Sequence, residues 1–264
     1  MPVSMPLLAA DLEAESAVLR ALLAELDEPD WKRATPAAGW SIADQVSHLA
    51  YFDDVTVTSA TEPEVFAAEK AELEARGGVN PDEVAARYRG LSGGELLAWF
   101  DASRARLVRT FAALDPALRV PWFGPAMSAA SSLTARIMET WAHGQDVADT
   151  LGVIREPSAR LRHVAHIGVG ARAFSHAVRG RPVPDAPVRV ELDAPDGSLW
   201  TWGPADAADR ITGTALDWAL LITQRRHRDD LALVVTGPAA QEWVEIGQAF
   251  AGAPGTGREP GTFA

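Results

Sequence analysis

The stretch SAASSLTARIMETWAHGQDVADTLG, residues 128–152, has the features of one long helix. Ser128 is a favoured residue type for a helix N-cap, and Gly152 stands where a glycine commonly ends a helix. Within this segment Glu139 and His143 are four positions apart. Side chains at this spacing lie on one helix face, with Cβ atoms about 5 to 6 Å apart. The pair is therefore a candidate for holding a metal ion.

The spacing alone is a weak signal. In a chain with this content of acids and histidines, about one acid-x-x-x-His pair is expected by chance. The sequence contains Asp44/His48 in addition to Glu139/His143. Ser41 and Asp44 together form a capping-box pattern, so we interpret Asp44 as a helix cap rather than a metal ligand.

Apolar residues at helical spacing dominate the first two thirds of the chain and predict an antiparallel helical bundle. The expected long helices cover about residues 8–26, 42–60, 94–114, 128–151 and 157–179. Between the second and third of these lies a crossover with two short helices, one near 63–76 and one begun by Asn80 and Pro81. Helical bundles build metal sites from side chains that project inward from facing helices.

The pattern changes after the Pro-rich segment GRPVPDAP, residues 180–187. Alternating apolar and polar residues then predict a β-hairpin, followed by a helix, a short strand and another helix. We therefore expect a mainly α protein with a bundle at 1–181, a small α/β domain at 182–252 and a disordered tail at 253–264.

Composition excludes several classes of function. The net charge of −12 argues against nucleic acid as a partner, because phosphate-binding proteins carry basic faces. No apolar run approaches the length of a membrane span, and the N-terminus lacks the basic start of a signal peptide, so we expect a cytoplasmic protein with no membrane partner. The chain has no cysteine, so a metal site has to use His, Asp or Glu. The sequence is compatible with a monomer or a homodimer.

His48 turns the opening pair into a candidate site of three ligands. It lies in the second long helix between Val46 and Leu49, where it can face the bundle interior. Together with Glu139 and His143 it would leave a tetrahedral metal one open position, as catalytic zinc sites do. The alternative is an ordinary core histidine in a purely structural bundle.

Two motifs resemble a known family. They are GWS at 39–41 with His48 and Leu49 about two turns into the following helix, and the run R-x-x-E-x-x-x-H-x-x-D formed by Arg136, Glu139, His143 and Asp146. They are similar to the DinB-like metal-binding bundle, and within it to the mycothiol-dependent maleylpyruvate isomerase family. Members of that family add a small C-terminal α/β domain related to sterol-carrier folds. The resemblance implies that His48, Glu139 and His143 are the metal ligands.

Two further residues of the motif are candidates for catalysis. Asp146, one turn beyond His143, either orients a ligand imidazole or is a solvated helix charge. Arg136, one turn before Glu139, either meets an anionic substrate, pairs with that carboxylate or forms a surface ion pair.

Arginines of the segment QRRHRDD, residues 224–230, are candidates in the second domain. Cations near a helix C-terminus are favoured by the helix dipole, which explains most clusters of this kind. The functional alternative is that Arg225 or Arg226 binds a substrate carboxylate through two parallel hydrogen bonds.

These observations lead to one functional hypothesis and two alternatives. The hypothesis is an enzyme that holds a divalent metal, with Zn²⁺ favoured over Ni²⁺ and Fe²⁺, and uses a mycothiol-like thiol to isomerise or transfer a small anionic substrate. The alternatives are a metal-dependent hydrolase and a non-enzymatic metal-containing protein that binds a ligand. The crossover after the second long helix is longer than the resemblance implies, so the substrate itself is left open.

Overall fold

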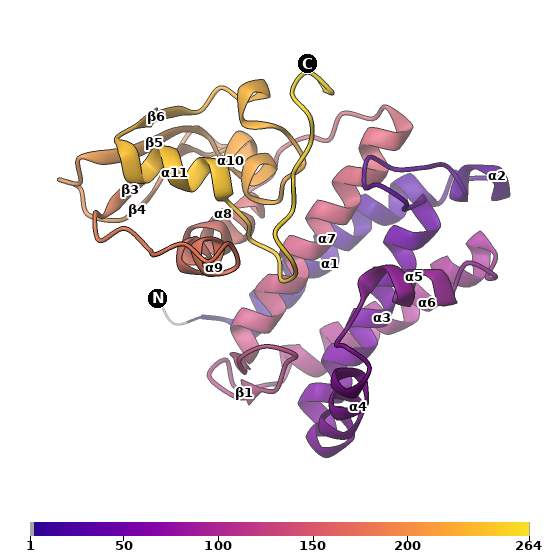
Figure 1. The fold of residues 1–264 in the computed structure, drawn as a ribbon. Helices are drawn as coiled ribbons and strands as arrows, with labels where there is room; N and C mark the ends of the chain where they lie inside the picture. The colour runs from indigo at the N-terminus through magenta and orange to yellow at the C-terminus, as the bar shows by residue number, and fades with distance from the viewer. Residues whose placement is uncertain (1–2, 264) are drawn as a thin grey trace. The chain divides into compact units, whose positions relative to one another are not determined.

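The structure is a computed structural model that describes residues 3–263 (Figure 1). The chain divides into two compact units, the first ending at Arg155 and the second beginning at Glu156. The predicted boundary after residue 181 is therefore wrong. The prediction of a mainly helical protein with a small C-terminal sheet is confirmed.

The first unit is a bundle of four long helices. They are α1 (Met5–Leu23), α3 (Ile42–Thr61), α6 (Gly93–Ala112) and α7 (Ala129–Leu151). Both α1 and α3 pack against α6 and α7, so each helix has two neighbours in the bundle. Two clusters of buried side chains fill the interior, one including Phe111 and Ile137 and the other Leu49 and Phe100. Within the described residues, no helix is long and apolar enough to span a membrane.

Capping interactions set the ends of the helices that carry the candidate site. The Ser41 hydroxyl accepts a hydrogen bond from the Asp44 amide, and the Asp44 carboxylate accepts one from the Ser41 amide at 2.8 Å. This is the predicted capping box, and it begins α3. Ser128 caps α7, and Gly152 ends it in a left-handed conformation with φ of 70°.

Shorter elements connect the four helices. They are α2 (Glu28–Trp31), α4 (Pro63–Ala75), α5 (Pro81–Arg87), β1 (Arg119–Val120) and β2 (Met127–Ser128). The predicted crossover helices correspond to α4 and α5, and the Asn80 side chain caps α5 as expected. The β1–β2 hairpin and α2 were not predicted, because two-residue strands and a single helical turn leave no periodic pattern.

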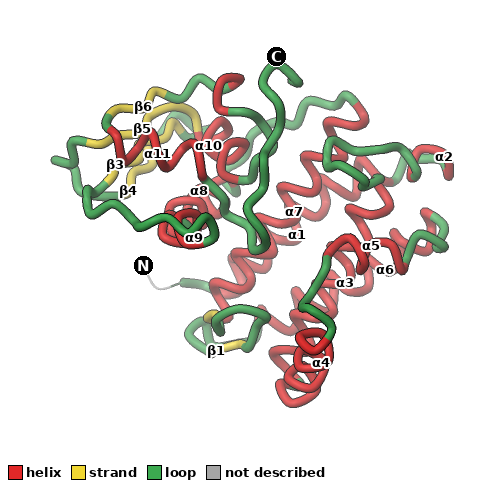
Figure 2. Tube along the Cα trace, viewed as in Figure 1, coloured by secondary structure: helices red, strands yellow, loops and turns green. Residues whose placement is uncertain are grey.

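The second unit is built on a four-stranded sheet in the order β4-β3-β5-β6. The strands are β3 (Val188–Asp193), β4 (Leu199–Trp202), β5 (Asp209–Thr214) and β6 (Val234–Thr236). β3 and β4 form the predicted hairpin, β5 runs parallel to β3, and β6 is antiparallel to β5. Figure 2 shows the helices of this unit beside the strands. They are α8 (Leu161–Gly170), α9 (Arg172–Ala177), α10 (Ala215–Ile222), the 3-10 turn η1 (Arg228–Asp230) and α11 (Pro238–Ile246).

The helix expected over 157–179 is two helices, α8 and α9, and both belong to the second unit. α8 packs against α10, and α9 packs against α11. The Trp218 indole N–H donates to the Ala165 carbonyl at 3.3 Å, and a Cβ on Gly168 would lie 2.8 Å from Ile222. The apolar face of α8 is thus fitted closely to α10, which is why the boundary lies before α8.

The C-terminal tail, predicted to be disordered, is described as far as Phe263. The Gly255 amide donates to Gln248 Oε1 at 3.3 Å, and the Gly261 amide donates to Asp230 Oδ1 at 2.8 Å. These hydrogen bonds join the tail to Gln248 and Asp230, and disorder of the tail stays a prediction.

Candidate metal centre

Three side chains predicted to form a metal site lie together inside the first unit. His48 comes from α3, and Glu139 and His143 come from α7. Glu139 Oε2 lies 3.2 Å from His143 Nε2 and 3.6 Å from His48 Nε2. Each residue offers one ligand atom, and the three atoms lie within 4.8 Å of one another. The spacing therefore predicted the right cluster, whereas metal binding itself stays a prediction.

A chain of hydrogen bonds fixes the tautomer of His143. Thr35 Oγ1 and the Trp40 carbonyl oxygen lie 2.9 Å apart. A carbonyl oxygen can only accept, so the Thr35 hydroxyl is the donor. The Thr35 hydroxyl consequently accepts from Gln45 Nε2 at 2.9 Å, which turns Gln45 Oε1 toward His143 Nδ1. His143 therefore carries its proton on Nδ1, and the lone pair of Nε2 faces Glu139. A metal-binding histidine needs this arrangement, with a partner that orients the ring through the other nitrogen.

His48 is held by ring packing instead. Its Nδ1 is buried and has no hydrogen-bond partner among the described residues. The Phe52 ring lies 4.6 Å from the His48 ring, and the Trp40 ring lies 5.2 Å from it, measured between centroids. Trp40 also stacks on His143, with 5.9 Å between centroids. Aromatic rings thus pack against both imidazoles.

The electrostatics of the cluster suit a cation. Burial and the neighbouring His143 lower the pKa of His48 to about 4, so its imidazole is neutral at pH 7. Burial raises the pKa of Glu139, but the neighbouring imidazoles of His143 and His48 outweigh that effect and hold the pKa well below its ordinary value. Two imidazole nitrogens and a carboxylate oxygen therefore converge. This donor set fits a divalent ion such as Zn²⁺.

The cluster is also reachable from solvent. The side chain of Glu139 is 20% exposed, and those of His48 and His143 are each 11% exposed. Structural zinc sites are closed by four protein ligands, whereas catalytic sites keep a position for water or substrate. Three ligands with partial exposure match the second pattern.

The partners of Arg136 are Asp53 and Leu49, and the alternative in which Arg136 pairs with the Glu139 carboxylate is not what the structure shows. Its Nε donates to Asp53 Oδ1 at 2.9 Å, and its Nη2 donates to the Leu49 carbonyl at 3.2 Å. Arg104 donates to the other oxygen of Asp53 at 2.6 Å. The Arg136 side chain is only 5% exposed. Its guanidinium is thus part of a buried ion cluster linking α3, α6 and α7, and it is not exposed to a substrate.

The two aspartates of the motif region have different surroundings. Asp146 is fully buried, so the alternative of a solvated helix charge is wrong. The partner of His143 Nδ1 is Gln45, and a role of Asp146 in orienting a ligand imidazole stays a prediction. Asp44 completes the capping box and accepts from Arg89 Nε at 2.9 Å. Burial raises the pKa of Asp44, but hydrogen bonds from Arg89 and Ser41 lower it below its ordinary value. The interpretation of Asp44 as a cap is confirmed.

Sequence reasoning missed Gln45 and Asp53. Both lie on α3 in the stretch DQVSHLAYFDD, at positions that face the interior. A buried glutamine or aspartate needs partners, so a polar residue on the apolar face of a predicted helix is the signal that could have singled them out.

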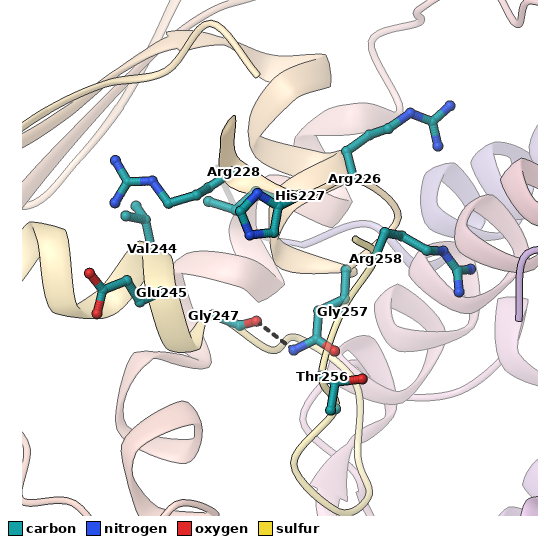
Figure 3. A pocket seen from close by; sticks show the side chains of 12 residues that line it. Arg226, His227, Arg228, Val244, Glu245, Gly247, Thr256, Gly257 and Arg258 are labelled. Atoms are coloured by element: carbon teal, nitrogen blue, oxygen red, sulfur yellow. Dashed lines mark hydrogen bonds between the residues drawn. The ribbon is translucent and has the colours of Figure 1, made fainter. Parts of the chain in front are cut away.

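Arg225 and Arg226 lie in the second unit. Arg225 donates to the Thr223 carbonyl at 2.6 Å, and the Arg226 guanidinium lies 3.9 Å from the centre of the Phe263 ring. Arg226 also lines a cavity of about 150 Å³, shown in Figure 3. In that view the side chains of Arg226 and Arg228 point in opposite directions. The arginine run therefore does not converge on one point, and a substrate contact of Arg225 or Arg226 stays a prediction.

The fold and the site define a class: a four-helix bundle that brings two histidines and a glutamate together, followed by a small α/β unit. The chain belongs to the family described as the mycothiol maleylpyruvate isomerase N-terminal domain, whose model matches residues 12–148. All three candidate ligands lie within the match. A second model, described as wyosine base formation, matches residues 184–236 in the second unit.

Similar proteins span nearly the whole chain. Uncharacterized proteins from two strains of Mycobacterium tuberculosis are each 47% identical over 253 residues, which covers 94% of this chain and 97% of theirs. Among solved structures, a mycothiol-dependent maleylpyruvate isomerase matches with a TM-score of 0.60, and a histidine-to-alanine mutant of it matches with 0.59. Each of these two is 15% identical and covers 90% of this chain and 96% of its own. At that identity the likeness shows the fold.

Proposed function

We propose that the protein is a divalent-metal-dependent enzyme that uses a small-molecule thiol of the mycothiol type for isomerisation or transfer. The observation that carries the proposal is the convergence of His48, Glu139 and His143 with the tautomer of His143 fixed by Gln45. Membership of the isomerase family supports the thiol. The metal is Zn²⁺ by preference, because imidazole and carboxylate ligands in a three-residue set suit it.

Each part of the site has a chemical task. A divalent ion bound there would lower the pKa of a thiol at its remaining coordination position. His48, Glu139 and His143 would hold the ion, and Gln45 would keep His143 in the binding tautomer. Because the chain has no cysteine, the thiol has to be an external molecule.

Isomerisation by an external thiolate consumes no other reactant. Sulfur adds to one carbon of a double bond, and the electron pair of that bond moves to a conjugated carbonyl group. Rotation about the resulting single bond follows. Return of the electron pair re-forms the double bond and releases the thiolate.

We also propose that Arg225 or Arg226 binds a carboxylate of the substrate, because a guanidinium can donate two parallel hydrogen bonds to a carboxylate. Replacing the relevant arginine by lysine keeps the charge but removes the two parallel hydrogen bonds. The expected result is a rise in KM of about tenfold, or about 1.4 kcal/mol, with metal content unchanged. An unchanged KM in both Arg225→Lys and Arg226→Lys would exclude this role.

The experiment for the main proposal combines elemental analysis with calorimetry. Purified protein should contain about one divalent metal per chain, and the metal-loaded protein should bind mycothiol. The metal-free protein should not bind it, because the thiolate needs the cation. Equal heats in both forms, or no binding in either, would reject the thiol mechanism and favour a metal-dependent hydrolase or a ligand-binding protein.

A further inference from the structure

The crossover that carries α4 and α5 contacts the surroundings of the metal site. On α4, Phe66 is only 1% exposed and stacks on Trp122, with 6.2 Å between ring centroids and 7° between ring planes. Phe66 also lies 5.3 Å from the Phe123 ring. Lys70, one turn further along α4, donates to the Trp122 carbonyl at 3.0 Å. α4 therefore fixes the Trp122–Phe123 segment of the β1–β2 hairpin.

α5 fixes a second aromatic residue. The Trp40 indole N–H donates to Asp82 in the first turn of α5 at 2.6 Å. Trp40 is the residue whose ring lies against both His48 and His143. The crossover thus positions aromatic rings through α4 and through α5.

Phe52 joins these rings into one surface. Its ring lies 4.6 Å from His48, 6.3 Å from Trp122 and 6.4 Å from Phe123. We call Trp40, Phe52, Trp122 and Phe123 the aromatic wall. Trp40, Trp122 and Phe123 are partly exposed, whereas Phe52 is buried.

Two cations of the first unit, Arg136 and Lys70, contact residues beside this wall and have partners of their own. Arg136 pairs with Asp53, and its side chain is 5% exposed. Lys70 binds the Trp122 carbonyl and lies 3.7 Å from Glu74. Both cations therefore already have partners, and the aromatic wall itself offers ring faces. Such faces favour planar apolar groups through offset stacking and edge contacts.

We propose that the aromatic wall is a specificity subsite that binds a planar apolar group, such as an aromatic ring, attached next to the metal-binding atom of the ligand. The inference rests on the proposed function, since it assumes a metal with an open position. It adds the chemical class of the group beside that position. It also gives the long crossover a role, which is to hold Trp40 and the Trp122–Phe123 segment in place.

The test uses two probes with the same metal-binding head, acetohydroxamate and benzohydroxamate. Both are titrated into the full-length, zinc-loaded protein, and the ratio of their Kd values measures the contribution of the ring. We expect benzohydroxamate to bind at least about tenfold more tightly. In Trp122→Ala and in Phe123→Ala the ratio should fall below about threefold, while acetohydroxamate affinity and zinc content stay at wild-type values.

Trp122→Phe is the matched control, because it keeps an aromatic ring and should keep the preference. The two proposals fail in different ways. If acetohydroxamate binds but the ratio is near one, or if the alanine variants keep the wild-type ratio, the aromatic wall is rejected and the metal site stands. If neither hydroxamate binds the zinc-loaded protein, the open position is rejected together with the subsite that depends on it.

Discussion

Replacing Gln45 by leucine tests the hydrogen-bond chain behind the metal cluster. Gln45→Leu is close in volume and removes only the acceptor for His143 Nδ1–H and the donor to Thr35. The His143 ring then loses the partner that selects its tautomer and orientation. Loss of such an orienting partner typically costs 10- to 100-fold in metal affinity, or about 1.4 to 2.7 kcal/mol.

The burial of His143 indicates how large the loss of metal affinity should be within the range of about 10- to 100-fold. His143 is 9% exposed, so water can replace the lost acceptor only in part. A buried N–H without a partner costs about 1 to 3 kcal/mol. In the variant the His143 ring can avoid this cost by turning to another orientation that does not bind the metal. Metal affinity falls by the free energy that this other orientation gains. We therefore expect Zn²⁺ affinity to fall by about tenfold or more. Thr35→Val, which removes only the next link of the chain, should cost less than about threefold.

The assay is a competition titration of Zn²⁺ with a chromophoric chelator at pH 7.5, run on wild type, Gln45→Leu and Thr35→Val. Circular dichroism of each metal-free protein shows whether the fold is retained. A Gln45→Leu affinity within twofold of wild type, in a folded protein, would refute the assignment of the tautomer-fixing role.

Three further outcomes are expected. Alanine at His48, Glu139 or His143 should remove most of the bound metal, and stoichiometric metal in all three variants would contradict the site. Asp44→Asn should lower the free energy of unfolding by about 1 kcal/mol at pH 7, because it weakens the α3 cap. The folded-state pKa of Asp44 is lowered from 3.8, so its contribution is present above that pH and is lost as the pH falls through the folded-state pKa. Urea unfolding curves of wild type and Asp44→Asn should accordingly converge as the pH falls below 3.8, and a constant difference would count against the cap. Asp53→Asn should destabilise the protein by about 3 kcal/mol or more, because it leaves two buried arginines without their counter-ion. Equal urea midpoints for Asp53→Asn and wild type would show that the buried ion cluster adds nothing.

Local signals in the sequence predicted the bundle and the three candidate ligands. Ser41 and Ser128 mark helix starts because a side-chain cap depends on neighbouring residues only. Glu139 and His143 were paired because helical spacing alone brings them together. The addition of His48 needed the further assumption that its helix faces the one that carries the pair.

Local sequence signals could not predict the contacts between helices. The pairing of Arg136 with Asp53 depends on how α7 approaches α3, and no spacing in the sequence encodes that distance. α8 has an apolar face of the kind that a helix in the bundle would also have. Its amphipathic pattern therefore could not show that it packs on α10 of the second unit. Composition likewise gives no indication of hydrogen bonds in the tail such as the one from Gly255 to Gln248.

The origin of the three candidate ligands in two helices has a consequence for folding. A single ion on His48 and Glu139 would tie together positions about 90 residues apart, with α4, α5 and α6 inside the closed loop. In the chain-entropy model, a cross-link around a loop of that length restricts the unfolded ensemble by about 4 to 5 kcal/mol. A chain without cysteine cannot form a disulfide, so the ion would be the cross-link between these distant positions. Metal loading would then determine how long the native bundle persists as well as whether it can react.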